Sequence, residues 1–303
     1  MAESNLFSKS FEPNHGQAVT VAKDVLRVTC RNSGPFTYKG TNSFIIGQNT
    51  LAVIDPGPID QLHLDLLLQT IGDRPVSHIF VSHTHADHSP LAAKLKASTG
   101  AKLVGAAPHF SARQLHLGEI NALDASADKE YAPDQVLRDG EIIDGDGWRI
   151  EAIETPGHTA NHVAFALADT GTVFSGDHVM AWSTTIVAPP DGSMSAYMAS
   201  LDKMLSRDDA LYLPGHGGEI QNPGPFLRGI KTHRKMRERA VLERLRSGDQ
   251  TIPQMVKEIY RSTDVRLHGA AGLSVFAHLE DLIEQGRVTC DGAPSLTTNY
   301  FAK

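Results

Sequence analysis

The sequence predicts an α/β fold with two sheets flanked by helices, followed by a smaller helical unit. Two observations lead to this prediction. Between residues 25 and 213, short apolar runs typical of strands alternate with longer segments of helical periodicity. After Asn222-Pro-Gly-Pro the chain becomes charged and helical, and residues 228–303 carry 13 Lys and Arg against 9 Asp and Glu. A boundary near residue 222 is therefore expected, giving domains 1–222 and 223–303.

The first domain is expected to contain strands where β-branched and aromatic residues gather between turn residues, and helices where apolar residues recur at helical spacing. The expected strands are 25–30, 43–47, 51–55, 76–82, 103–105, 148–153, 163–167, 172–174 and 211–213. The expected helices are 61–71, 108–117, 194–205 and one capped by Ser89 and Pro90 that runs to residue 98. The polar stretch from Gly118 to Asp134 is expected to be a surface excursion.

The second domain is expected to begin with three helices, over 227–245, 252–260 and 271–285. A strand-like segment follows at 287–290, and Asp291-Gly292 has the composition of a hairpin turn. Three helices followed by a short hairpin resemble a winged-helix unit.

The composition excludes several classes of protein. An apolar content of 41% and a charged content of 21% are typical of a soluble globular chain, and a net charge of −7 argues against a globally basic nucleic-acid coat. Cys30 and Cys290 lie at opposite ends, so no disulfide framework is expected. The sequence shows neither a signal peptide nor an apolar window of about 18 residues. The protein is therefore expected to be cytoplasmic and not membrane-bound.

The segment VSHTHADHSP, at residues 81–90, concentrates metal-binding side chains directly behind an apolar run. His83, His85, Asp87 and His88 form the pattern H-x-H-x-D-H. Imidazole nitrogens and carboxylate oxygens are the ligands that zinc and similar divalent ions prefer. Because alternate residues of a loop point in opposite directions, His83 and His85 can share one metal while Asp87 and His88 face a second.

Three further metal-binding side chains follow strand-like segments, each beside a glycine that allows a sharp turn. They are His158 in TPGHT, Asp177 in SGDH and His216 in PGHG. A single loop histidine is more often an ordinary residue, but four separate turns present the required atom type. The sequence therefore predicts a metal centre. His162 is expected either to support the metal centre through a hydrogen bond or to pack, and His178 to support it, to donate a proton or to pack.

The order H-x-H-x-D-H, G-H, G-D, G-H resembles the metallo-β-lactamase superfamily over residues 20–222. The segment GPFTYKGTNSFIIG at 34–47, the chain length and the winged-helix-like tail resemble the β-lactamase-like protein 2 group within it. The resemblance implies a four-layer αββα sandwich with two metals at one edge and a small winged-helix domain. It implies two ligand sets joined by Asp177: His83, His85 and His158 for one metal, and Asp87, His88 and His216 for the other.

Two divalent ions that share a water lower its pKa from about 15.7 toward about 7 and supply a metal-bridged hydroxide without a side-chain nucleophile. Asp87 and Asp177 are the expected catalytic residues. Zn²⁺ is the first choice of metal, and iron or manganese accept the same ligands.

The expected substrate is a small anionic ester, thioester or lactone. The helix expected over 227–245 is rich in Arg and Lys and starts just beyond His216. Its first half is therefore expected to lie over the metal cleft, where it could bind an anionic substrate. The expected substrate-binding residues are Tyr38, Thr41, Asn42, His233 and Arg234.

Other functions remain open. Cleavage of single-stranded RNA is supported by the group resemblance, but an aromatic content of 6% offers no evident stacking platform. A non-enzymatic DNA-binding role ranks last, since seven candidate ligands exceed what a closed structural site needs. Hydrolysis of β-lactams is disfavoured because no export signal is visible.

Overall fold

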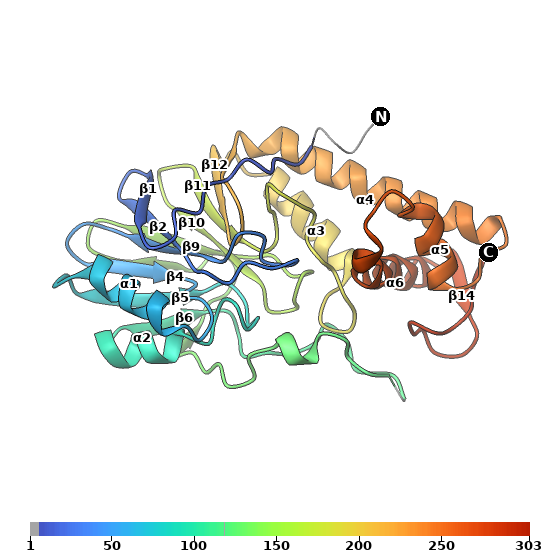
Figure 1. Ribbon diagram of the computed structural model, residues 1–303, viewed down its shortest axis with the longest axis horizontal. Helices are drawn as coiled ribbons and strands as arrows, with labels where there is room; N and C mark the ends of the chain where they lie inside the picture. Colours follow the sequence, from blue (N-terminus) through green and yellow to red (C-terminus); the bar gives the residue numbers. More distant parts are fainter. Residues whose placement is uncertain (1–5, 118) are drawn as a thin grey trace.

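The computed structural model describes residues 6–117 and 119–303. Within these residues two sheets pack face to face, and helices cover the outer face of each sheet (Figure 1). This confirms the four-layer αββα sandwich.

The first sheet has seven strands among the described residues, in the spatial order β1 (Ala18–Ala22), β2 (Val25–Thr29), β3 (Asn42–Ile46), β4 (Leu51–Ile54), β5 (Val76–Val81), β6 (Lys102–Gly105) and β7 (Gln135–Val136). The second has six in the same part of the chain, in the order β13 (Ile220–Gln221), β12 (Leu211–Pro214), β11 (Thr172–Gly176), β10 (Val163–Leu167), β9 (Arg149–Glu154) and β8 (Ile142–Asp144). The strands β4, β5 and β6 are parallel neighbours, as are β11 and β12.

Alternating side chains fill the space between the sheets. In β5, Phe80 points into the central layer, whereas Ile79 and Val81 point to the helices on the outer face. The ring of Phe80 meets that of Phe165 from the opposite sheet at a centroid distance of 5.3 Å. Strands that bury both faces read as continuous apolar runs, which explains why these segments were recognisable in the sequence.

Helices α1 (Gln61–Ile71) and α2 (Ala92–Thr99) cover the first sheet, and α3 (Met194–Leu205) and α4 (Pro223–Arg246) cover the second. The predicted bounds of 61–71 and 194–205 are confirmed. Both helices start at a side chain that accepts a backbone N–H: Asp60 caps α1 and Ser193 caps α3.

The predicted helix over 108–117 is wrong, because the described residues there form irregular backbone held by tertiary hydrogen bonds. The backbone N–H of Ala112 donates to Pro190, and the buried carboxylate of Asp191 accepts from Ser111 at 2.7 Å and from Asn121 at 2.9 Å. The predicted helix stop, Gly118, lies outside the described residues.

Two other local predictions are corrected. Ser89 does not cap α2, since its hydroxyl donates to Asp128 at 2.6 Å and the helix starts only at Ala92. Asp291-Gly292 is not a complete hairpin turn. Strand β14 (Val288–Cys290) pairs with β15 (Tyr300–Ala302), so residues 291–299 connect them.

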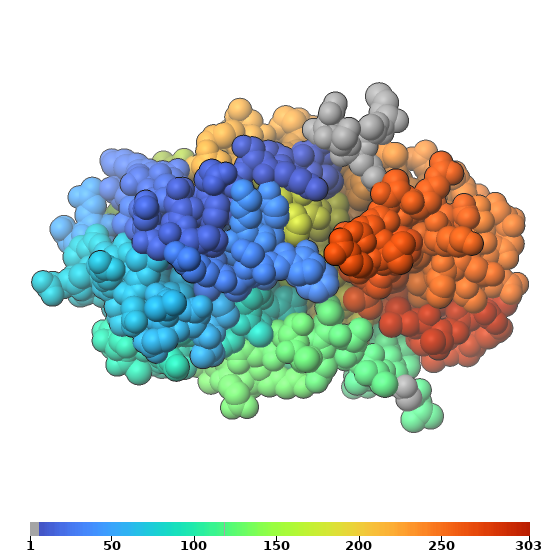
Figure 2. Space-filling model, viewed as in Figure 1, coloured from blue at the N-terminus to red at the C-terminus, as the bar shows by residue number. Residues whose placement is uncertain are grey.

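The winged-helix unit contains α5 (Ile252–Ile259), α6 (His268–Glu284) and the β14–β15 hairpin. Helix α4 joins it to the sandwich: Leu227 and Ile230 belong to the core around α3, whereas Leu242 and Leu245 belong to the core with α5 and α6. The boundary between 222 and 223 therefore stays a prediction. The C-terminal elements, orange to red, lie directly against the green segment of the chain (Figure 2). Among the described residues, no helix has the length and apolar character that crossing a bilayer requires.

Candidate metal centre

Four loops carry the predicted ligands to one edge of the sandwich. They follow β5, β9, β11 and β12, and within the described residues they bring together three groups whose ligand atoms all lie within 4.8 Å of one another. These groups are His83, His85 and His158; His83, His88 and Asp177; and Asp87, His88 and His216. The structure thus places all seven predicted metal-binding side chains in one cluster.

Hydrogen bonds on the outer side of the cluster fix the tautomers of two imidazoles. His88 Nδ1 lies 3.0 Å from Asp55 Oδ2, and His216 Nδ1 lies 3.2 Å from the carbonyl oxygen of Gly40. Because a carbonyl or ionised carboxylate can only accept, each Nδ1 carries the proton. Burial would lower the pKa of both rings, but the carboxylates of Asp87 and Asp177 raise it, that of His216 to about 9. The two Nε2 atoms lie 3.2 Å apart, and a metal ion would bind their lone pairs in place of a proton.

The first ligand set converges in the same way. His158 Nδ1 donates to the carbonyl of Ile186 at 2.6 Å, so its bare Nε2 faces His85 Nδ1 at 3.0 Å. His83 Nε2 approaches the same His85 nitrogen at 3.1 Å. Burial, followed by the neighbouring His158 imidazole, lowers the pKa of His85 to about 3. A neutral imidazole is the form that binds a metal.

Asp177 lies between the two sets. Its Oδ1 is 3.5 Å from His88 Nε2, and its Oδ2 is 3.4 Å from His216 Nε2 and 3.8 Å from His158 Nε2. Asp87 Oδ2 is 3.1 Å from His216 Nε2, and the Asp87 side chain is 27% exposed. Asp177 Oδ1 is a buried atom without a hydrogen-bond partner. The donor set fits two divalent ions.

Two glycines allow the side chains of the cluster to approach one another closely. A Cβ on Gly215 would lie 2.6 Å from His88 Cε1 and 2.7 Å from Asp177 Oδ1. Gly176 has a φ of +50°, and a Cβ there would lie 2.6 Å from His162 Nε2. His162 Nε2 accepts the backbone N–H of Asp177 at 3.1 Å, so this imidazole orients the turn that carries Asp177.

Asp55 is a supporting residue that the sequence analysis did not identify. Its Oδ1 accepts from the backbone N–H of Ser82 at 2.7 Å, and its Oδ2 accepts from the Ser82 hydroxyl at 2.6 Å and from His88. A carboxylate that holds the outer nitrogen of a metal-binding imidazole fixes the ring's direction. The sequence pattern that could have identified Asp55 is an aspartate directly after an apolar strand. The predicted ligands also follow strands.

His178 turns away from the cluster and packs on Tyr197, with ring centroids 4.9 Å apart. Both of its ring nitrogens are buried without a hydrogen-bond partner, and burial, followed by His158, lowers its pKa to about 3. Among hydrogen-bonding support, proton donation and packing, the three roles expected for this residue, the geometry favours packing.

Three of the predicted substrate-binding residues make structural contacts with other parts of the chain and do not line the cavity at the metal centre. Thr41 and Asn42 are 0% and 1% exposed, and Asn42 Nδ2 donates at 3.0 Å to the carbonyls of Pro214 and Gly217, which flank His216. Neither offers a surface to a substrate. The Tyr38 hydroxyl donates to the carbonyl of Lys9, and its ring stacks on Trp182 at 4.8 Å.

The metal centre opens into a cavity of about 360 Å³. Phe36, Met180 and Ile186 form its apolar wall. The surface excursion covers it: Leu123, Ala125 and Ser126 line the cavity, and the backbone N–H of Ala86 donates to the Ser126 carbonyl at 2.7 Å.

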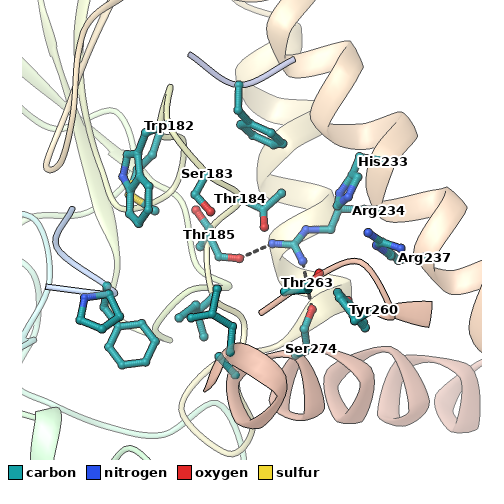
Figure 3. Close-up of a pocket in the computed structure, with 18 residues that line it drawn as sticks. Trp182, Ser183, Thr184, Thr185, His233, Arg234, Arg237, Tyr260, Thr263 and Ser274 are labelled. Carbon is teal, nitrogen blue, oxygen red and sulfur yellow. Dashed lines mark hydrogen bonds between the residues drawn. The ribbon is translucent and has the colours of Figure 1, made fainter. Parts of the chain in front are cut away.

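His233 and Arg234 line a second cavity, of about 310 Å³, between the sandwich and the winged-helix unit (Figure 3). Arg234 is 2% exposed, and its guanidinium donates to the Thr185 carbonyl and to Ser274 Oγ. It thereby fastens the loop after β11 to α6.

The sequence has similar proteins across its length. It is 28% identical over 284 residues to the β-lactamase-like protein 2 homolog of Drosophila melanogaster, covering 89% of this chain and 92% of that one. It is 28% identical to the atrochrysone carboxyl ACP thioesterase AgnL7 of Paecilomyces divaricatus, over 75% of this chain and 67% of that one.

Solved structures share the fold. A β-lactamase domain protein from Burkholderia ambifaria superposes with a TM-score of 0.79 at 20% identity, covering 97% of this chain and 96% of that one. A metallo-β-lactamase family protein from Thermus thermophilus gives a TM-score of 0.76 at 23% identity, covering 94% of this chain and 100% of that one.

Two family models match the sequence. The β-lactamase associated winged helix domain matches residues 251–294, in agreement with the position of α5, α6 and β14. The metallo-β-lactamase superfamily model matches residues 37–216, which is more than half of the chain and contains all seven clustered side chains. The chain therefore belongs to the metallo-β-lactamase superfamily of hydrolases and carries the associated winged-helix domain.

Proposed function

We propose that the protein hydrolyses a small acyl thioester, or a related ester or lactone. The observation that carries this proposal is the cluster of seven ligand side chains that opens into a cavity of about 360 Å³ with an apolar wall. A cavity of this size suits a small molecule. The relative AgnL7, named as an acyl carrier protein thioesterase, supports the choice of a thioester.

The residues act together on one face of the cavity. His83, His85 and His158 would hold one ion, Asp87, His88 and His216 would hold the other, and Asp177 lies between the two sets. Zinc is the metal we propose, and iron or manganese fit the same donors. When bound, the two ions supply Lewis-acid activation of water and of the carbonyl under attack.

Asp87 is the ligand suited to proton transfer. Both Asp87 and Asp177 line the cavity, but the Asp87 side chain is 27% exposed and that of Asp177 only 8%. Although burial alone would raise it, His88 and His216 hold the pKa of Asp87 below its usual value. We assign to an Asp87 carboxylate oxygen the proton released by the attacking water, which then passes to the leaving sulfur or oxygen.

The winged-helix unit gives little support to a nucleic-acid substrate. The helix before its hairpin, α6, carries Glu280, Asp281 and Glu284. Its Ala277 packs into the core around α3, and Glu280 pairs at 2.5 Å with Arg113 of the irregular segment 108–117. An acidic helix packed against the catalytic domain does not provide the basic surface that phosphate contacts need.

The test is metal analysis of the purified protein combined with a substrate panel of acyl thioesters, lactones, a phosphodiester and a chromogenic β-lactam. We expect thioesters to be hydrolysed with the highest kcat/KM and His85→Ala to abolish this activity. The matched control is His116→Ala, which removes a histidine outside the cluster and leaves activity unchanged. Preferred turnover of the phosphodiester, or full thioester activity in His85→Ala, would overturn the proposal.

A further inference from the structure

The cavity at the metal centre has an apolar wall whose parts come from three separate segments. Phe36 belongs to the loop between β2 and β3, Met180 and Ile186 belong to the loop after β11, and Leu123 belongs to the surface excursion. Phe36 is 53% exposed, and Leu123 and Ile186 are half-buried. These apolar surfaces are stabilised by a ligand that removes them from water.

Two hydrogen bonds fix this wall relative to the candidate metal ligands. The carbonyl of Ile186 accepts from His158 Nδ1 at 2.6 Å. The carbonyl of Ser126, in the surface excursion, accepts at 2.7 Å from the backbone N–H of Ala86, the residue after His85. A group bound at the metal centre therefore has the apolar wall at a fixed position beside it, so the wall can select among acyl groups.

The same cavity offers little to a charged acyl group. Of the residues that the structure describes, no lysine or arginine lines it. Its polar side chains besides the candidate ligands are Thr37 and Ser126, and the Thr37 hydroxyl already donates to the Asn32 carbonyl at 2.5 Å. A carboxylate at the far end of an acyl chain would lose water without gaining a cationic partner, which is costly.

The residues that led us to expect an anionic substrate lie elsewhere. His233 and Arg234 line the second cavity, between the sandwich and the winged-helix unit (Figure 3), and neither lines the cavity at the metal centre. The acyl group next to the metals is therefore surrounded by apolar side chains and not by the basic helix.

From these observations we infer that the cavity at the metal centre binds an uncharged, apolar acyl group longer than acetyl, and that Leu123 determines this specificity. The inference rests on the proposed function, since it names the acyl group of the same reaction. The Leu123 side chain can be replaced without losing a hydrogen bond, because only its backbone forms them: its N–H donates to Asn121 Oδ1 at 2.9 Å, and its carbonyl accepts from Ser126.

Three thioesters of N-acetylcysteamine test the length and the charge of the acyl group. The acetyl thioester is short, the hexanoyl thioester is long and neutral, and the adipoyl thioester has the same carbon chain but ends in a carboxylate. We expect the zinc-loaded protein to hydrolyse the hexanoyl thioester with a kcat/KM at least about tenfold above that of each of the others. Equal or higher kcat/KM for the acetyl or the adipoyl thioester would overturn the inference while the proposed function stands.

Leu123→Lys brings a cation to the wall and should lower the hexanoyl-to-adipoyl ratio of kcat/KM about tenfold or more. Ile120→Lys is the matched control: Ile120 belongs to the same excursion, is 85% exposed and does not line the cavity, so the ratio should stay as in the wild type. An unchanged ratio in folded Leu123→Lys would overturn the inference. If that variant does not fold, Ala125→Lys makes the same change from an exposed position in the lining, and the same outcomes apply.

Titration with hydroxamates tests the cavity without hydrolysis. The hydroxamate group chelates metal ions, so acetohydroxamate and hexanohydroxamate differ only in the apolar tail, and adipoyl monohydroxamate adds the carboxylate. We expect hexanohydroxamate to bind the zinc-loaded wild type at least about tenfold more tightly than each of the others, and Leu123→Lys to lose this preference over adipoyl monohydroxamate. This result with no thioester hydrolysed would contradict the proposed function alone, whereas equal affinities for the three compounds would overturn the inference.

Discussion

Three imidazoles of the metal centre each depend on an acceptor behind them. Asp55 holds His88, and the carbonyls of Gly40 and Ile186 hold His216 and His158. With the outer nitrogen protonated, the inner nitrogen is left bare and directed at its neighbours. The ligand geometry is therefore set by the chain before any metal binds.

Replacing Asp55 by Asn should weaken metal binding at the His88 side by about 10- to 100-fold without unfolding the protein. The amide retains the size of the carboxylate but loses the charge that holds His88 Nδ1–H and Ser82. Competition with a chromophoric chelator measures the affinity. Asp65→Asn, on the exposed side of α1, is the control, and wild-type zinc affinity in Asp55→Asn would contradict the supporting role.

His63 provides a pH-dependent contribution to stability outside the metal centre. It is 4% exposed, its Nε2 lies 2.9 Å from Ser43 Oγ, and burial lowers its pKa to about 4 from 6.5. In the unfolded chain it protonates first, so its contribution is complete above about pH 6.5 and declines as the pH falls from 6.5 toward 4.

Urea unfolding of the wild type and of His63→Gln at pH 7 and at pH 4.5 measures this contribution. The wild type should lose more free energy of unfolding over this interval than the variant, by at most about 3 kcal/mol. Equal losses in the two proteins would show that protonation of His63 is not linked to unfolding.

At the scale of elements, the ends of the strands position the metal-binding side chains. The carboxyl ends of the parallel pairs β4–β5 and β11–β12 meet at the edge where Asp55, the 83–88 loop, Asp177 and His216 lie. Tight turns then bring the side chains within reach of one another, and in the turn after β12 His88 and Asp177 fill the space beside Gly215.

Gly215→Ala should prevent metal binding while the sandwich still folds. The added methyl group would lie 2.6 Å from His88 Cε1 and 2.7 Å from Asp177 Oδ1, so both ligands would have to move. Metal content after dialysis and far-ultraviolet circular dichroism measure the two effects. Gly269→Ala, which meets open space at the start of α6, is the control; full metal content in Gly215→Ala would contradict the close approach.

Local signals explain which elements could be predicted from the sequence. Helices 61–71 and 194–205 have a capping side chain and an apolar face, and both agree with the structure. The segment 108–117 has apolar residues at helical spacing, but its backbone and side chains bond to Pro190 and Asp191, about 80 positions away, and such partners leave no local pattern.

The candidate site also contains residues that the sequence predicts and residues that it does not. The ligands were predictable because each lies in a short motif, either H-x-H-x-D-H or a turn beside a glycine, whereas Asn42 was misjudged because the carbonyls it supports lie about 170 positions later. Thr41 was misjudged because its side chain is buried and accepts a hydrogen bond from Asn32 Nδ2 at 2.8 Å. Arg234 was expected over the metal cleft. Its place beside a separate cavity depends on how α4 packs against α6, which composition does not specify.

At the scale of the whole molecule, α4 belongs to both halves. Leu227 and Ile230 complete the core around α3, and Leu242 and Leu245 complete the core of the winged-helix unit. The ion pair between Arg113 and Glu280, at 2.5 Å, adds a second connection. The second cavity exists only because the two halves pack together.

A chain truncated after residue 222 should therefore fail to fold, because the α3 surface that receives Leu227 and Ile230 would be exposed. A chain truncated after Gly248 keeps these residues and should retain more structure. Circular dichroism and size-exclusion chromatography distinguish the two. A stable, metal-binding protein ending at residue 222 would show instead that the domain boundary lies where the sequence predicts it.

The central claim is that two metal ions bind side by side within one cluster of seven side chains. Anomalous diffraction at the zinc edge from crystals of the zinc-loaded protein tests this claim most directly. We predict two peaks, one surrounded by His83, His85 and His158, the other by Asp87, His88 and His216, with Asp177 between them. A single peak, or zinc bound elsewhere, would contradict the account.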